Sequence, residues 1–162
     1  HVAARIADVL CKNSLSVDVR KISSVKDVSL YDGAIIGSAV RSASWYPDAI
    51  DFVGDHKDRL SKIPVAYFLT CLALYYDTPD AKAVADSYFK PVLEAVPEIR
   101  PFTRQAFAGV LDYDKLNMVV KMVMKSRMKE KGIPAGDFRD FDKIETWARQ
   151  QVMSKFKGTV QG

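Results

Sequence analysis

The feature that most constrains the fold is a series of short apolar runs separated by helical patterns. Runs at 33–39, 64–70 and 105–111 combine small, β-branched and aromatic residues. Runs of this length and composition are typical of parallel strands that are buried on both faces. Their alternation with helical segments predicts an α/β fold, in which helices cover both faces of a mostly parallel sheet.

Five segments place apolar residues at helical spacing. They lie at 1–10, 47–60, 80–96, 115–131 and 142–156. Pro47 suits the start of the second, because the first turn of a helix leaves its N–H groups unpaired in any case. A chain of 162 residues is the length of one domain, and we expect residues 1–162 to form one.

The beginning of the chain constrains the strand order. A further strand is predicted at 16–22, where Val17 and Val19 alternate with charged residues. The connection at 23–32 has no helical pattern, although adjacent parallel strands need a crossover of a dozen or more residues. The doubly wound order 2-1-3-4-5 removes this difficulty, because strand 1 then lies between strands 2 and 3. We therefore expect about 10–20 residues before His1, enough for strand 1 and a tight loop, without which the sheet has a central gap.

Composition narrows the classes of function. The chain carries a net charge of +4, and its hydrophobic and charged fractions, 48% and 27%, are ordinary for a soluble globular protein. Cys11 and Cys71 form no CxxC motif or Cys/His cluster, so we expect no metal site and reduced thiols in a cytoplasmic protein. The basic residues form no nucleic-acid-binding motif, so no nucleic-acid partner is expected.

Three loops leave the carboxyl ends of the predicted strands, at 38–46, 70–76 and 109–113. Ligands of such sheets bind beyond these ends. Small residues let backbone amides approach a planar ring and aromatic residues can stack on it, as a flavin requires. Its phosphate needs a helix N-terminus, here at His1. Turn chemistry is the alternative explanation for Ser and Ala at strand ends.

The segment at 115–131 is both methionine-rich and basic. It holds four of the five methionines and six Lys or Arg residues against one acid, Glu130. A basic amphipathic helix suits an anionic membrane surface, and methionine-rich faces adapt to hydrophobic partners. The alternative is a helix that packs on the sheet and leaves its charges in water.

Several of these segments together resemble a known family. The run at 31–41, and the run at 107–113 followed by the Met/Lys-rich helix, are similar to the flavodoxin-like protoporphyrinogen dehydrogenases. The resemblance covers most of the chain from Ala4 to about 147–149. It implies a flavodoxin-like fold and an FMN cofactor. It also implies oxidation of protoporphyrinogen IX to protoporphyrin IX in heme biosynthesis, with a quinone as acceptor, at the inner face of the cell membrane.

The resemblance also implies where the flavin is held. Residues 38–45 would form one wall around the isoalloxazine, 70–73 would contact its edge, and two residues of the last loop would close the site. The cofactor-binding residues are then Ser38, Ala39, Val40, Arg41, Ser42, Ala43, Ser44, Trp45, Thr70, Cys71, Leu72, Ala73, Gly109 and Leu111. No side chain is an obvious acid, base or nucleophile, because the flavin supplies the redox chemistry.

Four of the loop residues have a second interpretation. Arg41 either faces the flavin or a substrate propionate, or is solvated. Trp45 and Tyr46 either stack on the ring or anchor the next helix. Cys71 is expected to be a small buried filler rather than an activated thiolate.

Two other functions fit the same fold. A flavodoxin that carries electrons between proteins is one, although such carriers are typically acidic and this chain is basic. The other is a partner-binding domain that keeps the fold without the flavin.

Overall fold

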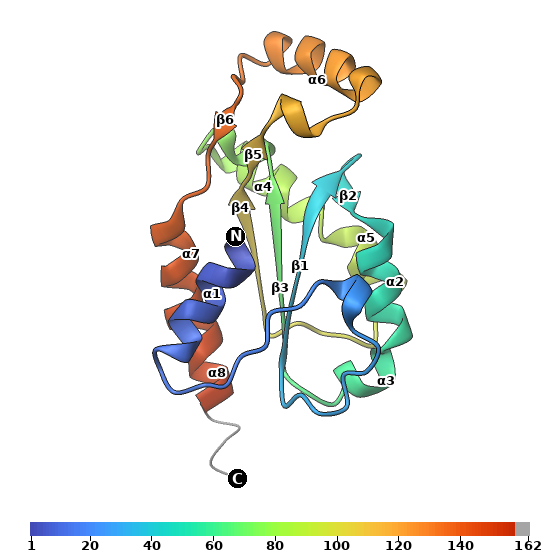
Figure 1. The fold of residues 1–162 in the computed structure, drawn as a ribbon, viewed down its shortest axis with the longest axis vertical. Coiled ribbons are helices and arrows are strands. Elements are labelled where there is room, and N and C mark those ends of the chain that lie inside the picture. Colours follow the sequence, from blue (N-terminus) through green and yellow to red (C-terminus); the bar gives the residue numbers. More distant parts are fainter. Residues whose placement is uncertain (158–162) are drawn as a thin grey trace.

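The framework of the fold is a sheet with three parallel strands, seen in the computed structural model, which describes residues 1–157 (Figure 1). The strands β1 (Ala34–Arg41), β3 (Val65–Cys71) and β4 (Thr103–Ala108) lie in this order and run parallel. A short strand, β2 (Ser44–Trp45), folds back antiparallel on the end of β1. The predicted parallel strands are therefore confirmed.

Helices cover both faces of this sheet (Figure 1). One face carries α1 (Val2–Cys11), α7 (Phe141–Trp147), a π-helical turn (Ala148–Val152) and α8 (Met153–Lys157). The other face carries α2 (Pro47–Asp55), α3 (Lys57–Leu60), α4 (Pro79–Ser87) and α5 (Lys90–Ala95). The α/β class with helices on both faces is confirmed.

The core has one hydrophobic cluster on each face of the sheet, and β3 contributes to both. Val65, Tyr67 and Leu69 face the cluster under α2 and α5, whereas Ala66 and Phe68 face the cluster under α1 and α7. Successive residues of a strand point to opposite faces, so a strand buried on both sides has to be apolar throughout. This is why 64–70 reads as a continuous apolar run.

A helical excursion extends beyond the carboxyl ends of the strands (Figure 1). It comprises β5 (Val110–Leu111), the 3-10 helix η3 (Tyr113–Lys115), α6 (Met118–Glu130) and β6 (Gly136–Asp137), which pairs antiparallel with β5. A third small cluster, centred on Leu111, Met128 and Ile133, holds it together. α6 begins at Met118 because the Asn117 side chain accepts the N–H of Val120.

The predicted strand at 16–22 is wrong. The segment contains no strand, and a 3-10 helix (Ile22–Ser24) lies at its end. No strand among residues 1–157 lies beside it to pair with its backbone N–H and C=O groups, as a strand requires. A cavity of about 760 Å³ separates it from β1, with apolar walls that include Ile6, Ile35 and Phe68.

Three other predicted elements are divided. The helix predicted at 47–60 is two helices, α2 and α3, with His56 between them. The helix predicted at 80–96 is two helices, because Pro91 near the start of α5 has no N–H to continue the hydrogen-bond ladder of α4. The strand predicted at 105–111 divides at Gly109, where the chain leaves β4 and pairs with β6 instead.

Replacing either of two glycines by alanine is expected to change the stability of the protein, in opposite directions at the two positions. Gly54 lies in α2, and a Cβ added there would meet Val96 at an ordinary 3.8 Å, whereas Gly132 after α6 has φ +64°. We expect Gly54→Ala to stabilise the protein by about 0.5–1 kcal/mol, because alanine loses less conformational freedom in a helix. Gly132→Ala should destabilise it by about 1 kcal/mol, because left-handed backbone is strained for alanine. Urea unfolding measures both. A stable Gly132→Ala variant would contradict the assigned end of α6.

Candidate functional site

The strand register brings the three candidate loops to one edge of the sheet, the edge formed by the carboxyl ends of its parallel strands (Figure 1). Ala39 of β1 is the register partner of Thr70 of β3, and Thr70 is the partner of Phe107 of β4. The loops at 38–46, 70–76 and 109–113 follow these positions directly. The residues proposed to hold the flavin therefore lie along a single edge, although they come from three separate stretches of sequence.

The first loop is a tight hairpin with unusual backbone. Arg41 pairs with Ser44, and the two residues between them have positive φ, +51° at Ser42 and +61° at Ala43. Two-residue hairpins of this kind usually carry Asn or Gly at these positions, because a side chain in left-handed backbone costs roughly 1–2 kcal/mol per residue. Strained backbone of this sort concentrates at ligand-binding loops.

Hydrogen bonds hold the base of the hairpin. The Ser38 hydroxyl, which is buried, donates to the carbonyl of Ala39 at 2.8 Å and accepts the N–H of Tyr46 at 3.0 Å. Ser38 therefore fixes where the loop leaves and re-enters the sheet. The exposed side chains of Ala39, Arg41 and Ala43 remain at the surface of the edge.

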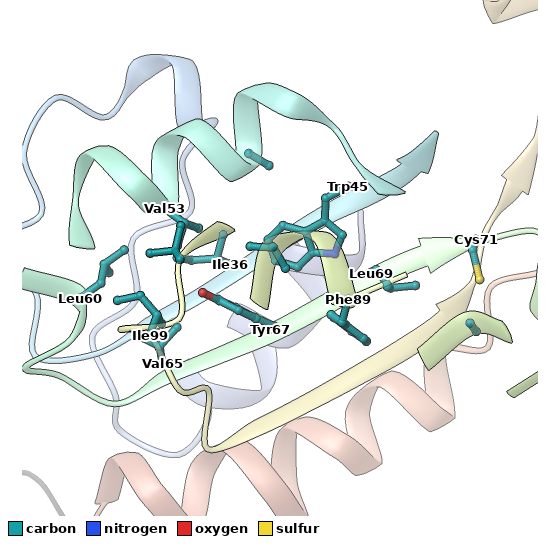
Figure 2. Close-up of a cluster of buried hydrophobic side chains, with 14 residues drawn as sticks. Ile36, Trp45, Val53, Leu60, Val65, Tyr67, Leu69, Cys71, Phe89 and Ile99 are labelled. Carbon is teal, nitrogen blue, oxygen red and sulfur yellow. The ribbon is translucent and has the colours of Figure 1, made fainter. Parts of the chain in front are cut away.

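The two aromatic residues of this loop have different surroundings. Trp45 is buried, and its ring centre lies 5.0 Å from that of Tyr67 and 6.1 Å from that of Phe89 (Figure 2). Its side chain anchors the hairpin and the start of α2 in the core. Tyr46 is exposed, so it is the aromatic residue that this loop presents at the edge of the sheet.

The second loop surrounds a cysteine that is not activated. Cys71 is a free thiol and is buried, and burial raises the pKa of the thiol. A neutral buried thiol is a packing group rather than a nucleophile. Thr70, Leu72 and Ala73 beside it are half-buried and line the edge.

The third loop joins the excursion to the sheet. Gly109 donates its N–H to the carbonyl of Cys71 at 2.9 Å and accepts the N–H of Phe138 at 3.0 Å. Leu111 is buried in the third cluster. Both residues fix the approach of the excursion to the edge of the sheet.

Two features at this edge suit anions. The Arg41 side chain is exposed, and its guanidinium has no hydrogen bond or ion pair with residues 1–157. The N-terminus of α1 lies toward the same end of the strands (Figure 1), with no side-chain cap and no acid in its first turn. Its free N–H groups and the positive end of the helix dipole suit a phosphate.

A second cavity, of about 420 Å³, lies between the β5–β6 ribbon and α6. It is lined by Val110, Leu111, Asp112, Tyr113, Asp114, Lys121, Lys125, Ala135 and Gly136. The sequence does not reveal this cavity, because the residues that line it lie up to 26 positions apart and meet only through the β5–β6 pairing. Two lysines of the basic segment 115–131, Lys121 and Lys125, line it.

Two further structural findings concern metals and membranes. Within residues 1–157, no group of three or more His, Cys, Asp or Glu side chains is placed to hold a metal ion. No helix in the same part of the chain is long and apolar enough to span a bilayer.

Comparison with known proteins identifies the class. The profile of the flavodoxin domain family matches residues 1–135, which is most of the chain, and the protein belongs to this family. The chain is also similar to protoporphyrinogen IX dehydrogenase [quinone] of Escherichia coli K12, at 20% identity over 168 residues, covering 99% of this chain and 92% of the relative. The proteins of that name from strains O6:H1 and O157:H7 match to the same extent. No solved structure matches the chain.

Family membership implies a site for FMN, and the described residues fit one. The edge of the sheet offers exposed small residues, one exposed aromatic ring, an unpaired arginine and an uncapped helix N-terminus. A planar ring with a phosphate tail needs each of these. The match to an enzyme-named relative is distant, but it supports an oxidoreductase of this type.

The hairpin strain gives a testable prediction. We expect Ala43→Gly to stabilise the protein by about 1 kcal/mol, because glycine adopts positive φ without crowding its Cβ. Ala39→Gly is the matched control in extended backbone of β1, and it should destabilise by about 0.5–1 kcal/mol. Thermal unfolding of both variants measures the difference. Equal destabilisation by the two substitutions would rule out left-handed backbone at Ala43.

Proposed function

We propose that this protein is an FMN-dependent oxidoreductase that oxidises protoporphyrinogen IX to protoporphyrin IX in heme biosynthesis, with a quinone as electron acceptor. The observation that carries the proposal is the position of α6. This helix lies just beyond the strand ends where the candidate loops meet (Figure 1). It exposes both apolar and basic residues. An apolar ring system and a lipid-soluble acceptor can both reach the loops from such a surface. The name of the distant relatives supports the same reaction.

The candidate loops divide the task of holding FMN. The exposed hairpin residues 39–43 and the half-buried Thr70, Leu72 and Ala73 would hold the ring, and Tyr46 would stack near it. The first turn of α1 would hold the phosphate through backbone N–H groups. FMN, when bound, supplies the redox chemistry by accepting electrons from the substrate.

The chain's own residues bind and orient the substrate. Arg41 can hold a propionate through paired hydrogen bonds, since its guanidinium has no partner in the described chain. The buried Cys71 thiol stays neutral and takes no part, because burial raises its pKa. The net charge of +4 attracts an anionic substrate at long range.

We infer that the 760 Å³ cavity beside β1 accommodates a further strand. In a sheet that is covered on both faces, each strand residue occupies about 160 Å³. This volume is the product of the rise per residue, about 3.3 Å, the distance between strands, about 4.8 Å, and the distance between packed layers, about 10 Å. The cavity thus has room for about five residues, and it runs along Gly33 to Gly37. A strand parallel to β1 there would end near the start of α1, and the loop between them would complete the phosphate site. A strand there would lie between the segment 16–22 and β1, which is the place that the order 2-1-3-4-5 gives to strand 1.

We also propose that α6 lies against the inner face of the cell membrane, with the rest of the protein in the cytoplasm. Met118, Val119, Met122 and Val123 are 85%, 70%, 70% and 45% exposed. Exposed lysines and arginines flank them along the helix. An apolar stripe with cations on either side complements an anionic lipid surface. The apolar side chains are buried among the lipids, and the anionic headgroups attract the cations.

The absorbance spectrum of the purified protein tests the reaction. We expect FMN at about one per chain, and protoporphyrin fluorescence that rises when protoporphyrinogen IX and a soluble quinone are added without oxygen. Bound FMN without turnover would favour an electron-carrying flavodoxin instead. A colourless protein that fails to bind added FMN would remove both redox functions and leave a partner-binding domain.

Flotation with anionic liposomes tests the membrane surface. We expect binding at low salt that weakens as salt screens the charges. Met122→Glu should reduce binding about tenfold, because burial of one large apolar side chain contributes roughly 1.5–3 kcal/mol. Val84→Glu is the control, since Val84 is also exposed but lies on α4. A protein that stays unbound at low salt, or equal losses in both variants, would contradict the proposal.

A further inference from the structure

The cavity between α6 and the β5–β6 ribbon is built from both apolar and charged groups. Val110, Leu111 and the ring of Tyr113 provide its apolar walls, and Lys121 and Lys125 reach it from α6. Its volume of about 420 Å³ falls within the range of small-molecule pockets. It adjoins the loop at 109–113, one of the three loops at the candidate flavin site.

Each of the two acids of the cavity is paired with a lysine. Asp112 accepts from Lys115 at 3.0 Å and from the backbone N–H of Asp114 at 3.0 Å, contacts that lower the pKa of its carboxyl group. Asp114 pairs with Lys121 at 3.0 Å, but the Asp114 side chain is 92% exposed. An ion pair so open to water is weak, so Lys121 can exchange this partner for another carboxylate.

Lys125 is the cation that remains. Its Nζ lies 5.6 Å from the centre of the Tyr113 ring, and it makes no ion pair with any side chain of residues 1–157. A cation above an aromatic face, next to an apolar wall, matches a flat ring that carries a carboxylate. The ring can contact Tyr113 and Val110 while the carboxylate meets the ammonium group.

We propose that this cavity binds one carboxylate side chain of a flat tetrapyrrole, with Lys125 as its principal partner and Lys121 as the second. The proposal rests on the proposed function and names the residues that select the substrate. It places the carboxylate on α6 and the ring toward the loops at the strand ends. The excursion then determines specificity, whereas the sheet edge holds the cofactor.

Binding of protoporphyrin IX and of its dimethyl ester tests this assignment. The two probes have the same ring, but only the free acid carries carboxylates. We expect the wild-type protein to quench the fluorescence of the free acid at about tenfold lower concentration than that of the diester, since a hydrogen bond to a charged group contributes at least this factor. Lys125→Met should remove this preference, and Lys125→Arg should restore it. Lys129→Met, on the same helix but outside the cavity, should leave it unchanged.

The outcomes separate this proposal from the proposed function, because FMN content is read independently from the absorbance of each variant. A preference for the free acid that depends on Lys125 supports the site, even where no FMN is bound. Wild-type protein that binds neither probe, or binds both equally, overturns it. So does a preference that survives Lys125→Met in a variant whose circular dichroism matches wild type, even where FMN is bound.

Discussion

Burial of β3 on both faces is the constraint on which the rest of the structure depends. Its alternate side chains pack into two different clusters, and its backbone pairs with β1 on one side and β4 on the other. This pairing fixes the register that sets Ala39, Thr70 and Phe107 side by side. The candidate site is a consequence of that register, because the loops that follow parallel strands all leave from the carboxyl ends of the sheet.

The excursion depends on the same sheet edge through one residue. Gly109 bonds to Cys71 at the end of β3 and to Phe138 on the chain returning from β6. The chain therefore enters and leaves the excursion at one point. The inner side of α6 packs in the third hydrophobic cluster. The outer side, with Met118 and Met122, has no such partner in the described chain and faces water.

The sequence predicts the parts of the fold that depend on local pattern. The continuous apolar run of β3 is recognisable because a strand buried on both faces cannot alternate. The segment 16–22 has a strand-like pattern, but a strand forms only beside another strand. The local sequence does not show whether such a partner is present. For the site, the three loops were predictable from the strand ends. The burial of Trp45 and the cavity around Lys125 were not, because both depend on contacts between distant segments.

The exposed face of α6 also bears on the choice between the functions proposed for this fold. A carrier that exchanges electrons with soluble proteins gains nothing from a stripe of four apolar side chains, which costs hydration free energy whenever it is uncovered. An enzyme with an apolar substrate and a lipid-soluble acceptor gains a surface that both can cross. The basic residues around the stripe act in the same direction, since they attract anionic lipids and carboxylated rings alike. Charge and exposure on one helix are therefore the structural reason for proposing the enzyme rather than the carrier.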